Sequence, residues 1–585
     1  MKKTLLVALI TSTVMVAVLG TGSFFLYKQS EKIKDEQDKA VQEELDIFLE
    51  DVDKEVFDSR ELNEIHTDMN DTPLSSVYSE EYTAQQNKRI KKNKKKNLYD
   101  FESPMWIWNV YGTNNLSMYT YFKTKQAAYV RYTIQVEDSG VPNFTRTLYN
   151  GEEGNVTREH EYQLTGFVPG CLNYLMLELY DEKDNFLNRK VYTIQVPKLK
   201  SGAKTKLELA SGRSEEQITN GLYTVFGKEN IWLYDNSGVL RGEIPLKERS
   251  SQKMLQEKEG LIYATSKSEI VKVGRLGQIQ KIYSLGAYEQ YEDFLYNGYG
   301  KLWIMVSKSG KTTKSVKDTV ISLDLKTKEV KELFSMEKLL PKMEKKAKRQ
   351  KGQKTFDWVN LNGITQVNSD ELLVSSKELS SIFKVVKINS REPRISFIIG
   401  EKEIWKNSGY EKKLLEKQGQ KEADEEQQSQ QEESVLNLGD AKEVFYATFG
   451  QTWLEKQSGS GLGEGQYYLY VWDSNYGNSP TRKDMKWSRY RGVGTDKREA
   501  RYSYIQKYLV DENSALYNLE DTIKVEYTKE QGSTQFYGND RIDNYGYVGA
   551  YAEYDKNGQL LRKFTHGLSG IYRVEKLAYK EFWYQ

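Results

Sequence analysis

Polar residues surround two strands predicted between residues 357 and 386, and this stretch points to a particular chemistry. Asp357, Asn360 and Asn362 come before the first strand, and Lys377-Glu378 follow the second. Amide and ammonium groups donate hydrogen bonds to oxyanions, and a carboxylate can accept a proton from a substrate. Lys377-Glu378 therefore indicates either an anion clamp or a solvated ion pair. Asn362 is equally a donor or an ordinary turn residue.

The stretch resembles bacterial aryl-sulfate sulfotransferases, whose comparable loop runs Asp-Trp-x-His-x-Asn-Ser and whose next turn runs Ser-Ser-Arg-His-Gln. Five residues match this pattern: Asp357, Trp358, Asn362, Ser375 and Ser376. Asn360 stands where the family has histidine, and Lys377-Glu378 stand where it has Arg-His. The residues around the site thus match the family pattern, whereas the family's histidines and arginine are replaced by other residues.

Two further segments extend the resemblance. Residues 288–302, YEQYEDFLYNGYGKL, are similar to the family segment Tyr-His-His-Asp followed by Asn-Gly, with Tyr291 and Glu292 in place of the histidine pair. Residues 450–452, Gly-Gln-Thr, are similar to Gly-Gln-His, which carries the family's nucleophile, and put Thr452 in its place. The three histidines of the chain lie outside these motifs: His66, His160 and His566.

Sulfuryl transfer from a phenolic sulfate ester to a phenol needs a nucleophile, donors for the sulfate oxygens and a proton acceptor. The family uses histidines, one of which is transiently sulfurylated. A threonine hydroxyl is a weak nucleophile without an adjacent base, although Glu292 or Glu378 could be that base. The resemblance implies seven site residues: Thr452, Asn360, Glu292 and Tyr291 at catalytic positions, and Asn362, Lys377 and Glu378 at substrate-binding positions.

Three functions follow as hypotheses. The first is a catalytically impaired aryl-sulfate sulfotransferase-like protein that binds phenolic or aromatic sulfate small molecules. The second is an active sulfotransferase with altered catalytic residues. The third is a cell-surface scaffold that works through other parts of the chain. Losing a nucleophile together with its partners costs many orders of magnitude in rate, which favours the first hypothesis.

Composition indicates an all-β protein. The 585 residues include 42 tyrosines and only 9 prolines, a balance typical of strands joined by Gly, Asn and Asp turns. The chain has 85 basic and 84 acidic residues, so its net charge is only +1. This charge balance does not favour nucleic acid as a partner. The single cysteine, Cys171, excludes an intrachain disulfide, and the histidines lack metal-ligand spacing, so neither a metal nor a cofactor is expected.

The amino terminus predicts a membrane anchor. Residues 4–27 are uncharged and follow Met1-Lys2-Lys3, and they are long enough to cross a hydrocarbon core of about 30 Å as a helix. A cleaved signal peptide is the alternative, since residues 17–20 could form a cleavage region. The favoured prediction is a single-pass cell-membrane protein with the bulk of the chain outside the cytoplasm.

Residues 28–98 are predicted to form a charged, partly helical stalk. Five apolar residues share one helical face: Val41, Leu45, Phe48, Val52 and Val56. This face could pair with a second copy or lie on its own domain. The basic run at residues 88–96 is expected to be a solvated linker, with contact to anionic lipid or wall polymer as the alternative.

Two β domains are predicted after the stalk. Residues 103–197 have short alternating segments typical of an Ig-like β-sandwich, and residues 109–119, NVYGTNNLSMY, resemble the amino-terminal signature of the same family. Residues 205–585 predict a six-bladed β-propeller. Its evidence is six polar turns that each separate two apolar segments, beginning at Asp235, Gly274, Asp324, Asn389, Asp511 and Asp555. Residues 411–434 are predicted to be a polar insertion.

Overall fold

The computed structural model describes residues 56–57, 72–152, 154–213, 221–249, 252–258, 260–310, 315–418 and 447–585. The predicted membrane anchor, most of the predicted stalk and residues 419–434 of the insertion lie outside these ranges. Within them, no helix combines the length and apolarity needed to cross a membrane. The described chain is mostly β, as its composition predicted.

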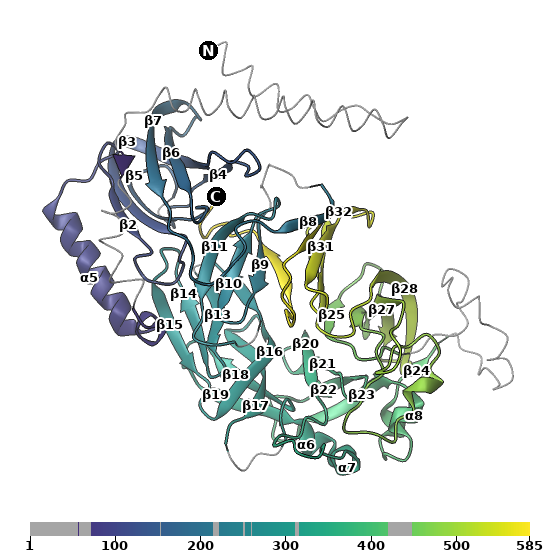
Figure 1. The fold of residues 1–585 in the computed structure, drawn as a ribbon. Helices are drawn as coiled ribbons and strands as arrows, with labels where there is room; N and C mark the ends of the chain where they lie inside the picture. Colours follow the sequence, from purple (N-terminus) through teal and green to yellow (C-terminus); the bar gives the residue numbers. More distant parts are fainter. Residues whose placement is uncertain are drawn as a thin grey trace, which may run out of the picture. The chain divides into compact units, whose positions relative to one another are not determined.

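The amino-terminal β domain is built around one long strand, β3 (Met118–Gln135) (Figure 1). The first half of β3 pairs with β2 and β5, and its second half pairs with β4 and β6. The other strands are β1 (Val56–Phe57), β2 (Met105–Trp108), β4 (Phe144–Thr147), β5 (Thr157–Leu164), β6 (Leu172–Tyr180) and β7 (Phe186–Gln195). Alternating residues of β3 bury aromatic and aliphatic side chains, including Tyr132 and Ile134, which explains why this segment is stable as a strand.

Two parts of the predicted stalk have a different structure from the one expected. Val56 belongs to β1, which pairs in parallel with β7, rather than to a helix. The basic run lies in α5 (Glu80–Lys96), which follows α4 (Leu74–Val77). Ser79 caps α5 by accepting a hydrogen bond from the Tyr82 backbone N–H at 3.0 Å. Because Tyr82 and Ile90 are buried on one face of α5, the run is an anchored helix and not a solvated linker.

Six sheets of four or five strands follow this domain, and all but one of their strand pairs are antiparallel (Figure 1). The first three contain β9 (Leu222–Phe226), β10 (Asn230–Tyr234), β11 (Leu240–Pro245) and β33 (Val574–Leu577); β12 (Met254–Glu257), β13 (Gly260–Ser266), β14 (Glu269–Val273) and β15 (Ile279–Ser284); β16 (Tyr288–Tyr296), β17 (Lys301–Lys308), β18 (Thr319–Asp324) and β19 (Val330–Ser335). The last three contain β20 (Leu361–Asn368), β21 (Glu371–Ser376), β22 (Ser381–Val386) and β23 (Arg394–Gly400); β24 (Glu416–Lys417), β25 (Trp453–Gln457), β26 (Gln466–Asp473), β27 (Tyr502–Asp511) and β28 (Leu516–Glu526); β29 (Gly532–Tyr537), β30 (Asp540–Tyr545), β31 (Ala550–Tyr554), β32 (Leu560–Thr565) and β8 (Glu208–Gly212).

All six polar turns predicted from the sequence join consecutive antiparallel strands, one in each sheet. The turn that starts at Asp235 shows the reason. One carboxylate oxygen of Asp235 accepts hydrogen bonds from the backbone N–H groups of Ser237 and Val239 at 2.8 and 2.9 Å, which closes the turn. Gly238 has a φ of +75°, a conformation that few other residues adopt at low cost. The turn predictions are therefore confirmed.

One edge strand of each of several sheets contacts the corresponding strand of the next sheet. β16 contacts β20, β20 contacts β25, β25 contacts β29, and β29 contacts β33. We call these five the inner strands. The last of them, β33, pairs with β9, so the first sheet is completed by the carboxy-terminal end of the chain. Side chains at the ends of the inner strands are consequently brought close to one another from distant parts of the sequence.

Short helices lie in the connections between strands. They are α6 (Met336–Leu339), α7 (Pro341–Lys346), α8 (Lys402–Trp405), and the 3-10 helices η1 (Glu411–Lys413) and η4 (Trp487–Arg489). α7 begins with proline, which is well tolerated at the first turn of a helix. η1 and β24 are the described part of the predicted polar insertion.

Candidate functional site

The seven predicted site residues lie in the inner strands or in the turns next to them. Tyr291 and Glu292 are in β16, at an irregularity where the pairing with β17 shifts between Gln290 and Phe294. Asn362 is in β20, and Asn360 directly precedes that strand with a φ of +45°. The remaining three lie in adjoining turns: Lys377 and Glu378 between β21 and β22, and Thr452 directly before β25.

Lys317, which the sequence did not indicate, organises the most polar part of the site. Its ammonium group lies 3.2 Å from Oε1 of Glu292 and 3.9 Å from Oδ2 of Asp357. The amide of Asn360 donates a hydrogen bond to the same Asp357 oxygen at 2.6 Å. The Lys317 ammonium also lies 5.6 Å from the centre of the Tyr291 ring. We call these five residues the Lys317 cluster.

Burial changes the proton affinities in the Lys317 cluster. It raises the pKa of Asp357 to about 6, although Lys317 and the amide of Asn360 oppose the shift. Glu292 raises the pKa of Lys317, which stays cationic. Among the described residues, neither Oδ1 of Asp357 nor the buried hydroxyl of Tyr291 has a hydrogen-bond partner. Unsatisfied buried polar groups at one place are the groups that a ligand or water would satisfy.

Lys377 lies next to this cluster. Its backbone N–H donates to the carbonyl oxygen of Asn360 at 3.0 Å, and its ammonium pairs with Glu530 at 2.6 Å. The side chains of Lys377 and Glu530 are 23% and 37% exposed, so solvent reaches this pair. The accessible site therefore holds two lysines, Lys317 and Lys377, together with three carboxylates.

Glu378 holds a neighbouring loop in place. Its Oε1 accepts hydrogen bonds from the backbone N–H of Thr481 at 2.7 Å and from the Thr481 hydroxyl at 2.5 Å. The side chain of Ser479 donates to the Glu378 carbonyl oxygen. Burial raises the pKa of Glu378 to about 7, and the bonds from Thr481 oppose this shift. The carboxylate therefore positions residues 479–481.

Thr452 and Asn362 are also turned toward the protein. The Thr452 side chain is buried, and its hydroxyl donates to the carbonyl oxygen of Gly532 at 2.6 Å. The amide of Asn362 donates to the carbonyl oxygen of Gln451 at 2.5 Å, and its oxygen accepts from the Ser375 hydroxyl at 2.7 Å. Both residues tie neighbouring sheets together.

Tyr572, a second residue that the sequence did not indicate, links the segments that carry Asn362 and Thr452. Its hydroxyl lies 2.8 Å from the carbonyl oxygen of Asn362 and 2.7 Å from that of Thr452. Burial, followed by the charge of Glu292, raises its pKa, so the phenol stays protonated. The next residue, Arg573, forms a buried ion pair with Asp293 of β16. No motif marks either Tyr572 or Arg573, because both come from the connection to the last strand.

The described histidines lie elsewhere. His160 is in β5, where its ring nitrogens lie 3.1 Å from the Thr124 hydroxyl and 3.0 Å from the Tyr162 hydroxyl. Nδ1 of His566 accepts from the backbone N–H of Leu568 at 3.1 Å. Burial lowers the pKa of both histidines to about 4. Within the described ranges, no group of three His, Cys, Asp or Glu side chains could hold a metal ion.

A cavity of about 240 Å³ lies between the inner strands β16, β20 and β25. Its lining includes Asp293 and Arg573 and none of the seven predicted site residues. The structure thus brings Tyr291, Glu292, Asn360 and Lys377 together around Lys317. Thr452, Asn362 and Glu378 lie beside this group, with their polar atoms bonded to the protein.

Two family models define the class of protein to which this architecture belongs. One, described as Arylsulfotransferase (ASST), matches residues 209–576, and the other, described as Arylsulfotransferase Ig-like domain, matches residues 105–197. The first match alone covers more than half of the chain. The chain belongs to the arylsulfotransferase family, which confirms the resemblance read from the motifs. No individually curated protein matches the sequence.

Two solved structures show remote likenesses to this chain. The WD40 domain of coronin from Toxoplasma gondii is 9% identical, with 62% of this chain and 75% of that chain covered and a TM-score of 0.30. An auxiliary nutrient binding protein from Bacteroides thetaiotaomicron is 9% identical, with 76% and 81% covered and a TM-score of 0.28. Scores this low carry no argument about function.

Proposed function

We propose that this chain is a transfer-impaired member of the arylsulfotransferase family that binds a phenolic or aromatic sulfate molecule at the Lys317 cluster. In this proposal the six sheets are the blades of a six-bladed propeller, and the inner strands surround its axis. The contacts between successive inner strands and the pairing of β33 with β9 support this arrangement. The Lys317 cluster then lies at the mouth of the propeller.

One observation carries the proposal. The hydroxyl at the predicted nucleophile position, that of Thr452, is buried and donates a hydrogen bond to the Gly532 carbonyl oxygen. A hydroxyl attacks a sulfate ester only when a base removes its proton, and a carbonyl oxygen is not such a base. The described histidines, His160 and His566, form their hydrogen bonds with residues other than Thr452. Sulfuryl transfer through Thr452 is therefore expected to be slower than in a histidine-based site by many orders of magnitude.

The same geometry suits a bound phenol. The unpartnered Oδ1 of Asp357 can accept the phenolic proton, the Tyr291 ring can pack against an aryl ring, and the Tyr291 hydroxyl can donate to an oxygen of the ligand. Lys317 and Lys377 are the cations available for a sulfate group. Because both lysines already pair with carboxylates, a neutral phenol is expected to bind more tightly than its sulfate ester.

A second candidate is an active sulfotransferase with altered residues. The observation that favours it is the pKa of Asp357 at about 6, and that of Glu378 at about 7, within the range of a general base at neutral pH. In that reaction Asp357 would take the proton of the acceptor phenol. The sulfuryl group would still have to pass through a nucleophile, or directly from a bound aryl sulfate ester, which leaves as the phenolate, to the acceptor phenol.

The proposed location is the outer face of a cell membrane, with residues 4–27 as a single-pass anchor. This part of the proposal rests on the uncharged stretch after Met1-Lys2-Lys3. The proposal also includes self-association through the apolar face predicted for residues 41–52.

The test uses the full-length chain in detergent with p-nitrophenyl sulfate as donor and phenol as acceptor. We expect no nitrophenolate release above the level of a Thr452→Ala variant, and an increase in melting temperature with phenol that Asp357→Asn abolishes. Turnover that depends on Asp357 but not on Thr452 would establish the second candidate. The absence of both turnover and stabilisation would refute ligand binding at this site.

A further inference from the structure

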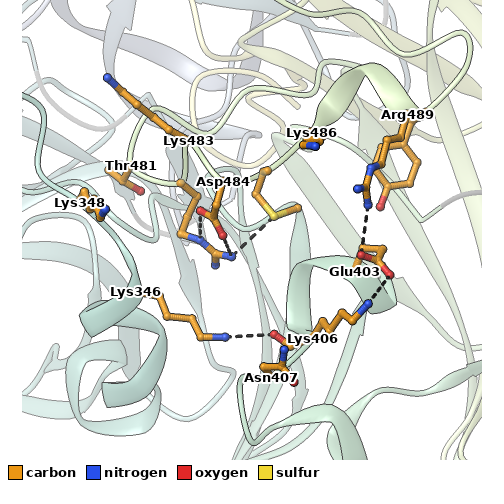
Figure 2. A pocket seen from close by; sticks show the side chains of 13 residues that line it. Lys346, Lys348, Glu403, Lys406, Asn407, Thr481, Lys483, Asp484, Lys486 and Arg489 are labelled. Atoms are coloured by element: carbon orange, nitrogen blue, oxygen red, sulfur yellow. Dashed lines mark hydrogen bonds and ion pairs between the residues drawn. The ribbon is translucent and has the colours of Figure 1, made fainter.

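A separate cavity of about 600 Å³ lies between three connecting segments, outside the Lys317 cluster. Its walls come from the end of α7, from the end of α8 and from residues 481–490, which include η4 (Figure 2). Seven cationic side chains and only two carboxylates line it. The excess of positive charge makes this cavity the opposite of the Lys317 cluster, in which carboxylates outnumber lysines.

Two hydrogen bonds hold the walls of the cavity together, and only one of them involves a lysine side chain. The backbone N–H of Lys348 donates to the Thr481 carbonyl oxygen at 2.7 Å, which joins the segment after α7 to the loop. The Lys346 ammonium donates to the carbonyl oxygen of Lys406 at 3.0 Å, which joins α7 to the end of α8 (Figure 2). Thr481 is itself bound to Glu378. Tertiary contacts between separate segments of the chain therefore form the walls of this cavity.

Three aromatic side chains, Phe449, Trp487 and Tyr490, pack together and anchor the loop. The ring of Tyr490 lies 4.7 Å from that of Phe449, and Phe449 is 5.9 Å from Trp487 in η4. Tyr490 and the half-buried Met485 line the cavity and give it an apolar wall beside its cations.

Arg482 is the key residue of the cavity. Its side chain is only 4% exposed, and it makes two hydrogen bonds to Asp484, from Nε to Oδ1 at 2.9 Å and from Nη2 to Oδ2 at 2.8 Å. Among the described residues, its third nitrogen, Nη1, is buried without a hydrogen-bond partner. A buried guanidinium with a free N–H donor is a ready partner for a bound oxyanion.

Three lysines add positive charge without internal compensation. Lys348, Lys483 and Lys486 line the cavity, and no acidic side chain in the described ranges pairs with any of them. The two carboxylates of the lining are already used, because Asp484 pairs with Arg482, and Glu403 lies 3.3 Å from Arg489 and 3.7 Å from Lys406 (Figure 2). A ligand that brings its own negative charge would complete this arrangement.

We propose that this cavity binds a small organic sulfate or phosphate ester, with its oxyanion at Arg482 and the unpaired lysines and its apolar part against Met485 and Tyr490. The volume falls in the range of small-molecule sites, about 300–1,000 Å³, and far exceeds the space of a bare ion. The site goes beyond the proposed function, and neither depends on the other.

The test is isothermal titration calorimetry on the full-length protein in detergent. The probes are p-nitrophenyl sulfate, p-nitrophenyl phosphate, the uncharged p-nitroanisole, and inorganic sulfate and phosphate. We expect one or both esters to bind, more weakly as salt is added because the lysines are exposed, and p-nitroanisole not to bind. The preferred ester identifies the ligand class. Equal affinity for the inorganic ion and the ester would overturn the organic part of the proposal.

A Lys348→Gln/Lys483→Gln double variant is expected to weaken ester binding about tenfold, because two nearby cations are lost. A Lys412→Gln/Lys413→Gln variant carries the same charge change on η1, outside the cavity, and is expected to bind as the wild type does. Equal weakening in both would mean that net charge attracts the ester and would refute a built site.

Two more variants complete the test. Arg482→Lys keeps the charge but lacks the planar fork, and is expected to weaken binding more than the lysine double variant does. Its melting temperature shows whether it folds, and the lysine variant tests the site if it does not. Ester binding that is lost in Lys377→Gln but normal in the lysine double variant would place the anion at the Lys317 cluster and overturn the proposal.

Discussion

The hydroxyl of Thr452 donates a hydrogen bond to the carbonyl oxygen of Gly532, 2.6 Å away. Thr452 precedes β25 and Gly532 begins β29, so this bond joins the inner strands of two neighbouring sheets. The residue predicted to stand at the family's nucleophile position is thus a structural link between two sheets. Its consequences for stability can be measured independently of any activity.

Thr452→Val is expected to lower the free energy of unfolding by about 1–3 kcal/mol, because it keeps the volume but removes a buried donor. Thr452→Ser is the matched control, since it keeps the hydroxyl. Urea denaturation of both variants measures the difference. If Thr452→Val were as stable as the wild type, the hydroxyl would not be committed to Gly532, and the argument against transfer through Thr452 would fail.

Gly532 is expected to tolerate no side chain. An added Cβ would lie 1.9 Å from Nε1 and 2.1 Å from Cε2 of Trp472, which is fully buried. Gly532→Ala should lower the free energy of unfolding by about 1–3 kcal/mol or more, since neither the strand nor the indole has room to move. Gly463→Ala is the control, because its Cβ would meet nothing nearer than 3.5 Å. Thermal denaturation that finds the two variants equally stable would contradict this packing.

Glu378 predicts a pH dependence. Burial raises its pKa from 4.5 to about 7, so the folded state holds this proton more tightly than the unfolded state does. Its contribution to stability is therefore complete below pH 4.5 and is lost as the pH rises to about 7. Relative to Glu378→Gln, the wild type should lose on the order of 3 kcal/mol of unfolding free energy across this range.

Urea denaturation of the wild type and Glu378→Gln at a series of pH values measures this difference. Asp357, whose pKa is raised to about 6, titrates in both proteins, so the comparison removes its own contribution and keeps its charge effect on Glu378. Glutamine keeps the oxygen that accepts both bonds from Thr481, so the loop should remain in place. Parallel pH profiles for the two proteins would show that the carboxyl group titrates normally.

The buried pair of Asp293 and Arg573 predicts a strong asymmetry between single and double variants. The two side chains are 8% and 1% exposed. Arg573→Met alone should cost about 3–5 kcal/mol of unfolding free energy, because it leaves a buried carboxylate without its partner. Asp293→Leu/Arg573→Met should recover much of this loss. A double-mutant cycle in urea tests it, and additive effects would contradict a direct pair.

Local patterns were sufficient to predict the strands and turns. Asp235 and Gly238 fix their turn through contacts within a few residues, and such contacts are visible in a sequence. The strands around residues 361–386 were predicted for the same reason, since their apolar runs lie between polar turns. The family motifs predicted seven site residues, and four of them, Tyr291, Glu292, Asn360 and Lys377, lie together around Lys317.

Long-range contacts were not predictable in this way. Lys317 and Tyr572 meet the site through connections between strands, and nothing in their neighbouring sequence shows that they do. The basic run in α5 was predicted to be a linker because its charges dominate the pattern. Its helix is stable because Tyr82 and Ile90 are buried on one face, which only the packed structure reveals. The roles of Thr452 and Glu378 also depend on partners far along the chain.

The pairing of β33 with β9 has a consequence for biogenesis. The ribosome makes β9 long before β33, so β9 must wait for its neighbour while residues 227–573 are synthesised. During that interval its unpaired backbone groups are open to wrong partners, including the same strand of another nascent chain. A chaperone that shields this unfinished edge, or rapid delivery of the carboxy terminus, would therefore govern how much correctly folded protein a cell obtains.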